Sequence, residues 1–357
     1  MALVHDLLTS LGGAERVLDA FLEIFPQAVI FTLLYDEKKT GGRYKNRQII
    51  TSFLQKYRLI TGKRDYLLRP FYPAAVEAFD FSDFDLIIAD GNAFSKGIIR
   101  CPESKFIYYC HSPMGYLWHW KDEYQKEHPQ GGRLTSLIFH YLRMWDQLSG
   151  QRPDLILANS ENVKQRIKKY YQRKAKVLYP PVETEKFQIS PKKAGYFLLV
   201  SRLSAYKKVN LTIKAFSQLK LPLLIVGTGQ EAARLKKLAR PYRNIEFKGY
   251  VLDSELKNIY SQARAFIFPA EEDFGLAVVE AMSSGTPVIA LDKGGSKETV
   301  VDGVNGLLFT EQTAASLVSA VKRFLEIEKK FNPEKIRQTA LRFDKNIFIK
   351  KFRALSD

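Results

Sequence analysis

The stretch AFIFPAEEDFGLAVVEAMSSGTPVIAL, residues 265–291, contains two apolar runs separated by a loop and a helical segment. Short apolar runs bounded by Gly, Pro or Asp are typical of strands buried on both faces of a parallel sheet. The helical spacing of LAVVEAM between the runs predicts the crossover that two parallel strands need. This stretch therefore predicts a doubly wound α/β fold.

The same alternation continues through nearly the whole chain and predicts two α/β units of similar size. Strands are expected at ALVHDLL, AVIFTLL, FDLIIAD, KFIYYCH and DLILANS in the first half, and at YFLLVSR, LPLLIVG, NIEFKGY, AFIFPA and TPVIALD in the second. Prolines and polar residues in 177–195 predict the break between the units. We expect Rossmann-like domains over 1–180 and 181–332, facing a central cleft, and C-terminal helices over 333–357 that pack back on the first domain.

Composition and charge narrow the class of protein. The 357 residues include only two cysteines, Cys101 and Cys110, and no metal-ligand spacing accompanies them. This usage is typical of a reducing compartment, and the absence of a leader-like start or a long apolar run predicts a cytoplasmic protein. A structural metal site is not expected.

The net charge of +17 is concentrated in the stretches 38–47, 56–64 and 164–176. A solvated cationic surface, an anionic membrane face and a nucleic-acid site are the three interpretations. No helix-turn-helix, zinc-finger or RRM-type motif accompanies the charge, so nucleic acid is disfavoured. A phosphate-bearing partner is favoured over a surface without a partner.

In a doubly wound domain, ligands bind at the carboxyl ends of the strands, so the residues after each strand are the candidates. In the first domain, Gly12 and Gly13 precede the first helix, where free N–H groups favour an anion. A tight strand–helix turn is the alternative for this pair. His111 follows the strand KFIYYC and is either a ligand for a hydroxyl-rich substrate or a packing histidine.

In the second domain, Arg202 and Lys207 follow the strand YFLLV, and together they are suited to one pyrophosphate. Glu272 is expected in the loop after AFIFPA, and Glu280 about one turn into the next helix. A carboxylate at Glu280 can accept hydrogen bonds from the two hydroxyls of a ribose. Two acids beside a diphosphate repel it unless they bind hydroxyls while the cations bind the phosphates. The alternative is a helix acid and an exposed loop acid without a ligand.

These residues resemble the signature of retaining family-4 glycosyltransferases with the GT-B fold. The pair Glu272 and Glu280 has the E-x7-E spacing of that family, and GGAERV, CHSP, SRLSAYKK, GTGQE and GGSKETVVDGVNGLLF extend the likeness over almost the whole chain. YLLRPFYPAAVEAFDFSDFDLIIADG and YYCHSPMGYLWH are similar to the O-antigen and polysaccharide mannosyltransferases that use GDP-mannose. The chain departs from that subgroup at Gly115, where the subgroup has arginine, and at His119, where the subgroup has an acid.

The resemblance implies a role for each residue. Gly12 and Gly13 are implied to contact the donor diphosphate, and Arg202 and Lys207 to offset its charge. Glu280 is implied to hold the ribose. Glu272 and the backbone of Phe274, Gly275 and Leu276 are implied to contact the transferred sugar. His111 is implied to lie near the reacting sugar, and the backbone of Val251 is implied to bind the base.

The resemblance therefore implies an enzyme that moves a hexose, such as mannose from GDP-mannose, with retention, onto a glycan or polyprenyl-diphosphate-linked acceptor. No Asp-x-Asp stands at a strand end, so no metal or other cofactor is expected. An anionic membrane surface is the expected partner, at the inner face of the cell membrane, and nucleic acid is not. The alternatives are a nucleotide-sugar epimerase or hydrolase of the same fold, a dinucleotide oxidoreductase, which lacks its G-x-G-x-x-G here, and a non-catalytic basic interaction protein.

Overall fold

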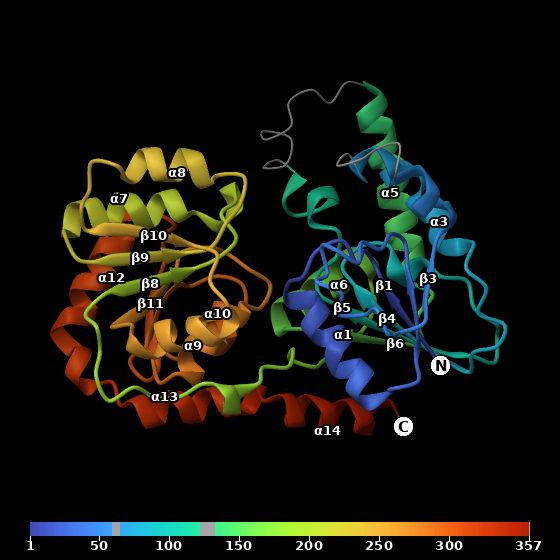
Figure 1. Ribbon diagram of the computed structural model, residues 1–357. Coiled ribbons are helices and arrows are strands. Elements are labelled where there is room, and N and C mark those ends of the chain that lie inside the picture. Colours follow the sequence, from blue (N-terminus) through green and yellow to red (C-terminus); the bar gives the residue numbers. More distant parts are fainter. Residues whose placement is uncertain (59–64, 122–132, 357) are drawn as a thin grey trace. The chain divides into compact units, whose positions relative to one another are not determined.

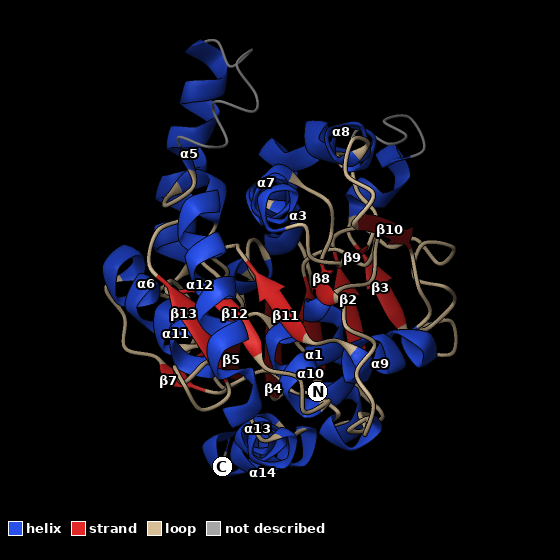
Figure 2. Cartoon of the chain, turned by 90° about the vertical axis from the view of Figure 1, so that its left-hand side faces the viewer, coloured by secondary structure: helices blue, strands red, loops and turns tan. Residues whose placement is uncertain are grey.

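The computed structural model describes residues 1–58, 65–121 and 133–356, and it divides the chain into two compact units (Figure 1). The first unit comprises Met1–Tyr179 with Ile349–Asp357, and the second comprises Pro180–Phe348. Each unit is a parallel sheet with helices on both faces, which confirms the predicted fold class of two Rossmann-like domains (Figure 2).

Within its described residues, the first unit holds a seven-stranded sheet in the order β3-β2-β1-β4-β5-β6-β7. The strands are β1 (Ala2–His5), β2 (Val29–Thr32), β3 (Ile49–Thr51), β4 (Leu86–Gly91), β5 (Lys105–Cys110), β6 (Leu155–Ala158) and β7 (Lys176–Val177). All pairings are parallel, with Ala2 opposite both Val29 and Ile87 at the centre of the sheet. The sequence did not predict β3 and β7, because these edge strands are only three and two residues long.

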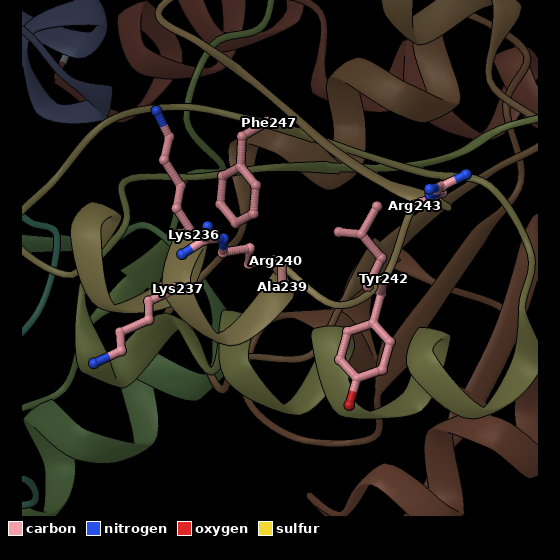
Figure 3. Close-up of a pocket in the computed structure, with 8 residues that line it drawn as sticks. Lys236, Lys237, Ala239, Arg240, Tyr242, Arg243 and Phe247 are labelled. Atoms are coloured by element: carbon pink, nitrogen blue, oxygen red, sulfur yellow. The ribbon is translucent and has the colours of Figure 1, made fainter.

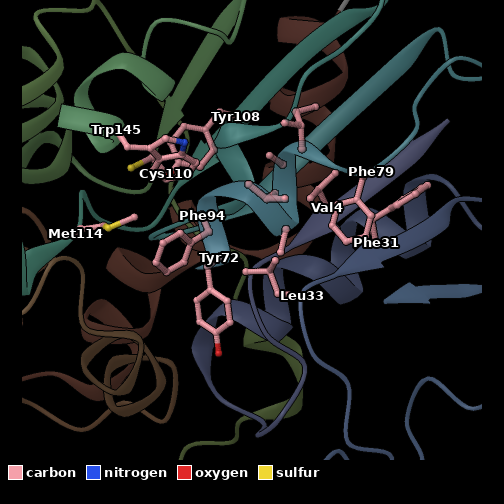
Figure 4. Close-up of a cluster of buried hydrophobic side chains, with 14 of the residues drawn as sticks. Val4, Phe31, Leu33, Tyr72, Phe79, Phe94, Tyr108, Cys110, Met114 and Trp145 are labelled. Atoms are coloured by element: carbon pink, nitrogen blue, oxygen red, sulfur yellow. The ribbon is translucent and has the colours of Figure 1, made fainter. Parts of the chain in front are cut away.

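The helices of the first unit cover the two faces of its sheet. They are α1 (Gly13–Ile24), α3 (Tyr72–Glu77), α5 (Arg133–Ser149) and α6 (Glu161–Tyr171), with the short 3₁₀ turns η1 (Phe53–Tyr57), η2 (Asp65–Phe71), η3 (Ser95–Gly97) and η4 (Gly115–Leu117). Alternate residues of β5 face opposite sides, as a strand requires. Tyr108 joins the core under α3, α5 and α6, drawn in Figure 4, whereas the Tyr109 ring packs edge-on to Phe21 of α1 at 5.9 Å.

The second unit, described without gaps, holds a six-stranded parallel sheet in the order β10-β9-β8-β11-β12-β13. Its strands are β8 (Phe197–Val200), β9 (Leu223–Val226), β10 (Ile245–Gly249), β11 (Ala265–Phe268), β12 (Val288–Leu291) and β13 (Gly306–Phe309). Its helices are α7 (Val209–Leu219), α8 (Ala232–Ala239), α9 (Asp253–Gln262), α10 (Leu276–Ser283), α11 (Ser296–Thr299), α12 (Ala314–Ile327) and α13 (Pro333–Ala340). The opening stretch forms β11, α10 and β12, as predicted.

The C-terminal helices differ from the expectation that everything from residue 333 packs on the first domain. Residues 333–348 belong to the second unit, because Ile336 and Ala340 of α13 are fully buried and the Phe343 ring contacts Phe274. Helix α14 (Lys345–Ser356) begins in the second unit and continues into the first, where the Phe352 ring lies 4.9 Å from that of Phe21. Across the described ranges, none of the helices has the length and apolar character that crossing a membrane requires.

Candidate functional site

Both sheets contain one point at which the strand order reverses direction. In the first unit this point lies between β1 and β4, and in the second between β8 and β11. Loops that leave two neighbouring strands at such a point diverge to opposite faces, and the gap between them is where doubly wound folds bind ligands. The residues after these four strands are therefore the candidates for a ligand site.

In the second unit, the reversal point brings together two of the predicted residues. Lys207 ends the 3₁₀ turn η6 (Ala205–Lys207) after β8, and Glu272 lies in the loop after β11. The Lys207 Nζ atom forms an ion pair with Glu272 Oε1, and their side chains are only 13% and 20% exposed. Arg202 is exposed in the same β8 loop, and within the described residues it has no carboxylate partner. One cation here is held by an acid, and the other is available to an anion.

The loop that carries Glu272 is held by two glycines that the site prediction did not include. The Gly295 N–H donates to the Glu272 carbonyl at 2.8 Å. Gly294 has φ +62°, and a Cβ there would lie 2.2 Å from the Glu272 carbonyl oxygen. Only glycine permits both this conformation and this approach. The stretch GGSKE at 294–298 is part of the family likeness, and its two glycines shape the Glu272 loop.

The residues after Glu272 lead directly into α10. Phe274 is buried, Gly275 precedes the first helical residue with φ +88°, and Leu276 begins the helix. The first N–H groups of an α-helix have no partner within the helix, so this end favours a polar or anionic ligand. The sequence placed these three residues at such a turn, and the structure agrees with that placement.

Glu280 lies in α10 and is 5% exposed. Its Oε2 atom accepts a hydrogen bond of 2.9 Å from the Tyr260 hydroxyl of α9. Tyr260 is itself fully buried, so it fixes the position of the Glu280 carboxylate. The sequence reasoning missed Tyr260, because a tyrosine at a helical core position gives no signal of this kind.

The loop after β10 contributes Val251, which is 7% exposed and follows the highly exposed Tyr250. Glycine contacts hold this loop close to the loops after β8 and β9. The Gly227 N–H donates to the Gly249 carbonyl at 2.8 Å, and a Cβ at Gly227, with φ +135°, would lie 1.9 Å from the Ser201 carbonyl oxygen. The carboxyl ends of β8, β9 and β10 therefore meet at one place in the second unit.

In the first unit, the reversal point holds a chain of four titratable side chains. The Asp90 carboxylate, fully buried at the end of β4, contacts His5 Nδ1 at 3.0 Å and His111 Nε2 at 2.6 Å. His5 Nε2 lies 3.6 Å from Glu15 Oε1 of α1. His111 was predicted as a site residue, and the structure shows that Asp90 orients its ring. His5, Asp90 and Glu15 were not predicted.

The protonation states in this chain follow from burial and charge. Burial alone would lower the pKa of His5, but its hydrogen bonds to Asp90 and Glu15 outweigh burial and raise that pKa to about 10. Burial likewise opposes ionisation of Asp90, yet the charge of His111 and the hydrogen bonds of both histidines hold the pKa of Asp90 below its usual value. His5 is therefore an imidazolium held between two carboxylates at neutral pH.

The glycine turn of the first unit opens α1. Gly12 is the N-cap residue, Gly13 is the first helical residue, and both are exposed. Burial opposes ionisation of Glu15, but the hydrogen bond and charge of His5 hold the pKa of Glu15 below its usual value. The backbone N–H of Gly12 contributes in the same direction. Glu15 therefore reaches back over the helix N-terminus, and part of the anion-binding potential predicted for this turn is already used.

Gly115 and His119, where the chain departs from the mannosyltransferase pattern, lie close to one aromatic ring. A Cβ at Gly115 would lie 2.3 Å from Trp120 Cε3, and the His119 ring lies 4.4 Å from that of Trp120. Both His119 nitrogens are buried, and among the described residues neither has a hydrogen-bond partner. Burial, with the nearby charges of Arg166 and Lys169, lowers the pKa of His119 to about 3, so this imidazole is neutral. Trp120 occupies the space that a larger side chain at Gly115 would need.

A separate hollow of about 530 Å³ lies on the second unit, lined by the end of α8 and by β10 (Figure 3). Lys236, Lys237, Arg240 and Arg243 surround it. The end of α8 leads into the start of β10, so this hollow lies at the amino edge of the sheet, opposite to Lys207. It is not part of the candidate site.

Comparison with known protein families covers both units. Residues 11–186 match Glycosyltransferase Family 4, and residues 181–342 match Glycosyl transferases group 1. The chain belongs to the glycosyltransferases that combine these two domains. The resemblance stated from the sequence is thereby confirmed at the level of the family.

Relatives of this glycosyltransferase include enzymes named as mannosyltransferases. It is 28% identical over 372 residues to alpha-1,3/1,6-mannosyltransferase ALG2 of Kluyveromyces lactis, covering 85% of this chain and 71% of the relative. It is 29% identical over 197 residues to the O-antigen chain mannosyltransferase RfbU of Salmonella typhimurium, covering 52% and 55%.

Solved structures show the same fold. Sucrose-phosphate synthase from Thermosynechococcus elongatus matches with a TM-score of 0.78 at 18% identity, covering 99% of this chain and 98% of that one. Anabaena HepE, in complex with UDP-glucose, matches with a TM-score of 0.73 at 20% identity, with the same coverage. At these identities the likeness shows the fold alone, which is the GT-B arrangement of two Rossmann-like domains.

Proposed function

We propose that this glycosyltransferase moves mannose from GDP-mannose, with retention of configuration, onto a glycan or polyprenyl-diphosphate-linked acceptor. The observation that carries the proposal is the ion pair of Lys207 and Glu272 at the reversal point of the second sheet, with Glu280 fixed nearby by Tyr260. The names of relatives such as ALG2, aligned over 85% of the chain, support mannose as the sugar.

In the second unit, Arg202 and Lys207 offset the diphosphate, and the Glu280 carboxylate, which Tyr260 positions, accepts from the ribose. Glu272 and the backbone at Phe274–Leu276 bind the sugar, and the Val251 backbone binds the base. In the first unit, Gly12 and Gly13 contact the diphosphate, and His111 contacts the reacting sugar.

The ion pair suggests how Lys207 and Glu272 share this work. In the structure, Glu272 holds the Lys207 ammonium at the carboxyl edge of the sheet, so the cation is in place before a diphosphate arrives. An ammonium has three N–H donors, and one contact with Glu272 leaves others for phosphate oxygens. The second Glu272 oxygen stays available for a sugar hydroxyl.

In the proposed reaction, the acceptor oxygen bonds to the anomeric carbon on the face from which the diphosphate departs. The bond between that carbon and the phosphate oxygen breaks, and the hydroxyl proton passes to the departing phosphate oxygen. Negative charge grows on the leaving group in the transition state, where positioned cations lower the barrier most. Arg202 and Lys207 supply those cations, so no metal ion is required.

Two measurements test this function. A thermal-shift panel of GDP-, UDP- and ADP-sugars should show the largest stabilisation with GDP-mannose, because a ligand that binds only the folded state raises the melting temperature. NMR of the product formed with the preferred donor should show retained anomeric configuration. Stronger stabilisation by a UDP-sugar would contradict the donor assignment, and Gly115 and His119 would be the first residues to examine. An inverted product would contradict the mechanism.

The lipid-linked acceptor leads to a second part of the proposal, which is peripheral attachment to an anionic membrane at its inner face. The net charge of +17 supports this attachment. Cationic side chains near an anionic bilayer contribute about 1 kcal/mol each. Binding to anionic vesicles should therefore weaken as salt rises, and equal recovery with neutral and anionic vesicles at low salt would contradict it.

A further inference from the structure

Helix α5 of the first unit has two apolar faces rather than one. Its inner face places Leu142 and Trp145, 1% and 7% exposed, in the core of the unit. Its outer face carries four large apolar side chains with high exposed fractions, which are Leu137 (65%), Tyr141 (48%), Met144 (53%) and Leu148 (64%). Spacings of four, three and four residues put these side chains on one side of a helix. We call them the outer stripe.

A continuous exposed apolar stripe differs from scattered surface hydrophobics. Single exposed leucines are common and need no explanation, but contiguous apolar patches mark a surface that contacts a partner. In Figures 1 and 2, α5 extends beyond its own sheet. Among its described side chains, residues 135–149, the one acid is Asp146, which is fully buried against Lys96. The outer stripe therefore presents no negative charge that would oppose an anionic surface.

A neighbouring turn extends the apolar surface. Leu67 and Phe71 of η2 are 49% and 58% exposed. The Arg69 guanidinium of η2 lies over the Tyr116 ring at 5.5 Å, and the Tyr116 ring lies 6.0 Å from that of Phe139 on α5. The turn η2 is thus connected to α5 through one layer of side chains. Two elements of the same region expose large apolar groups.

Two basic stretches, 38–47 and 56–64, are the sequence candidates for membrane contact. Part of their positive charge is paired with acids. Arg43 pairs with Asp19 at 3.0 Å, and Arg58 pairs with Asp36 at 2.7 Å. Lys56 remains exposed in the second stretch, and residues 59–64 of that stretch lie outside the described residues. Charge at these stretches can attract the enzyme to an anionic bilayer, but it supplies no apolar insertion.

We propose that the outer stripe of α5 enters the boundary between headgroups and acyl chains of an anionic bilayer and is the main membrane contact of this enzyme. The inference rests on the proposed membrane attachment and names its surface. An amphipathic helix binds a bilayer in this way, with affinity from its buried apolar area and from charge. A second copy of the chain is the other possible occupant, but each copy carries +17, which opposes association, whereas an anionic surface attracts it.

The test compares two triple variants of the whole chain. The stripe variant is Leu137→Gln, Met144→Gln and Leu148→Gln. The control variant is Val301→Gln, Val304→Gln and Leu341→Gln, which changes side chains of the second unit that are 49%, 47% and 42% exposed. All six positions lie on the surface, and urea unfolding verifies that both variants fold. Flotation with phosphatidylcholine vesicles, with and without phosphatidylglycerol, measures binding, and sedimentation velocity without vesicles measures self-association.

We expect the stripe variant to bind phosphatidylglycerol vesicles at least about tenfold more weakly than the wild type, and the control variant to bind as the wild type does. The residual binding of the stripe variant should disappear at high salt, because only charge remains. Equal binding by the stripe variant and the wild type overturns the proposal. The proposal is also overturned if the wild type forms a dimer and the stripe variant is a monomer while the control variant remains a dimer. A wild type that does not bind these vesicles overturns it as well. Thermal shift with GDP-mannose is independent of all three outcomes and reports separately on the proposed function.

Discussion

Lys207 and Glu272 form an ion pair that joins the loop after β8 to the loop after β11, at the point where the second sheet reverses its strand order. Both side chains are mostly withdrawn from water, so neither charge is strongly screened. The ion pair therefore brings predicted site residues of the two loops into direct contact, and an amide oxygen at position 272 would still accept a hydrogen bond from the Lys207 ammonium.

Replacing Lys207 by alanine should separate diphosphate binding from nucleoside binding. The Lys207→Ala variant should bind a nucleoside diphosphate about ten- to a hundredfold more weakly, the equivalent of about 1.5–3 kcal/mol, because charge-assisted contacts to the phosphates are lost. Affinity for the monophosphate should fall much less. Calorimetric titration measures both constants, and Lys214→Ala, at an exposed position of α7, is the control. Equal losses for the two nucleotides would refute the diphosphate role.

The network of His5 predicts a stability that depends on pH. The folded pKa of His5, raised to about 10, lies above its ordinary value of 6.5. Its contribution to the free energy of unfolding is therefore complete below pH 6.5 and is lost as pH rises toward 10. The pKa values of Asp90 and Glu15 are lowered, so their contributions are lost on acidification instead. The network should stabilise the first unit most between about pH 4.5 and 6.5.

Urea unfolding at pH 6 and pH 9 checks this prediction. The wild type should lose a few kcal/mol more over that interval than His5→Asn, because each pKa unit corresponds to about 1.4 kcal/mol. If the two proteins lose the same stability, His5 is not charged in the folded state.

The local pattern predicted the strands well, but contacts between distant residues could not be predicted in the same way. LVHD and IIAD each end in an acid, yet only the strand order that sets β1 beside β4 brings His5 to Asp90. SKG around Lys96 is typical of an exposed loop, and the structure buries that lysine completely. The sequence of α5 has an amphipathic pattern, and such a pattern cannot distinguish a helix with one buried face from one with two apolar faces.

Lys96 and Asp146 form an ion pair of 2.6 Å whose side chains are both fully buried. Asp146 also accepts from Trp118 Nε1 at 2.7 Å, so the pair connects η3 and α5 to the segment that follows His111. Lys96→Met should lower the free energy of unfolding by about 3–5 kcal/mol, because it leaves a buried carboxylate without its cation. Urea denaturation measures the loss. Lys45→Met, at an exposed position, is the control and should change stability by less than about 0.5 kcal/mol.

Turnover should not require a divalent metal ion, because Arg202 and Lys207 are placed to offset the diphosphate. Enzyme treated with EDTA and then assayed with purified donor and acceptor should retain full activity. A chelator that abolishes turnover, with magnesium or manganese restoring it, would show that the two cations are not sufficient.

The most direct measurement titrates GDP into the wild type, Glu280→Gln and Glu272→Gln by calorimetry. Glu280→Gln should weaken GDP binding by about 1.5–3 kcal/mol, because the ribose loses a charge-assisted hydrogen bond. Glu272→Gln should bind GDP nearly as the wild type does and lose turnover instead, because its proposed contact is with the sugar that GDP lacks. Equal losses of GDP affinity in the two variants would contradict the proposed division between the two acids.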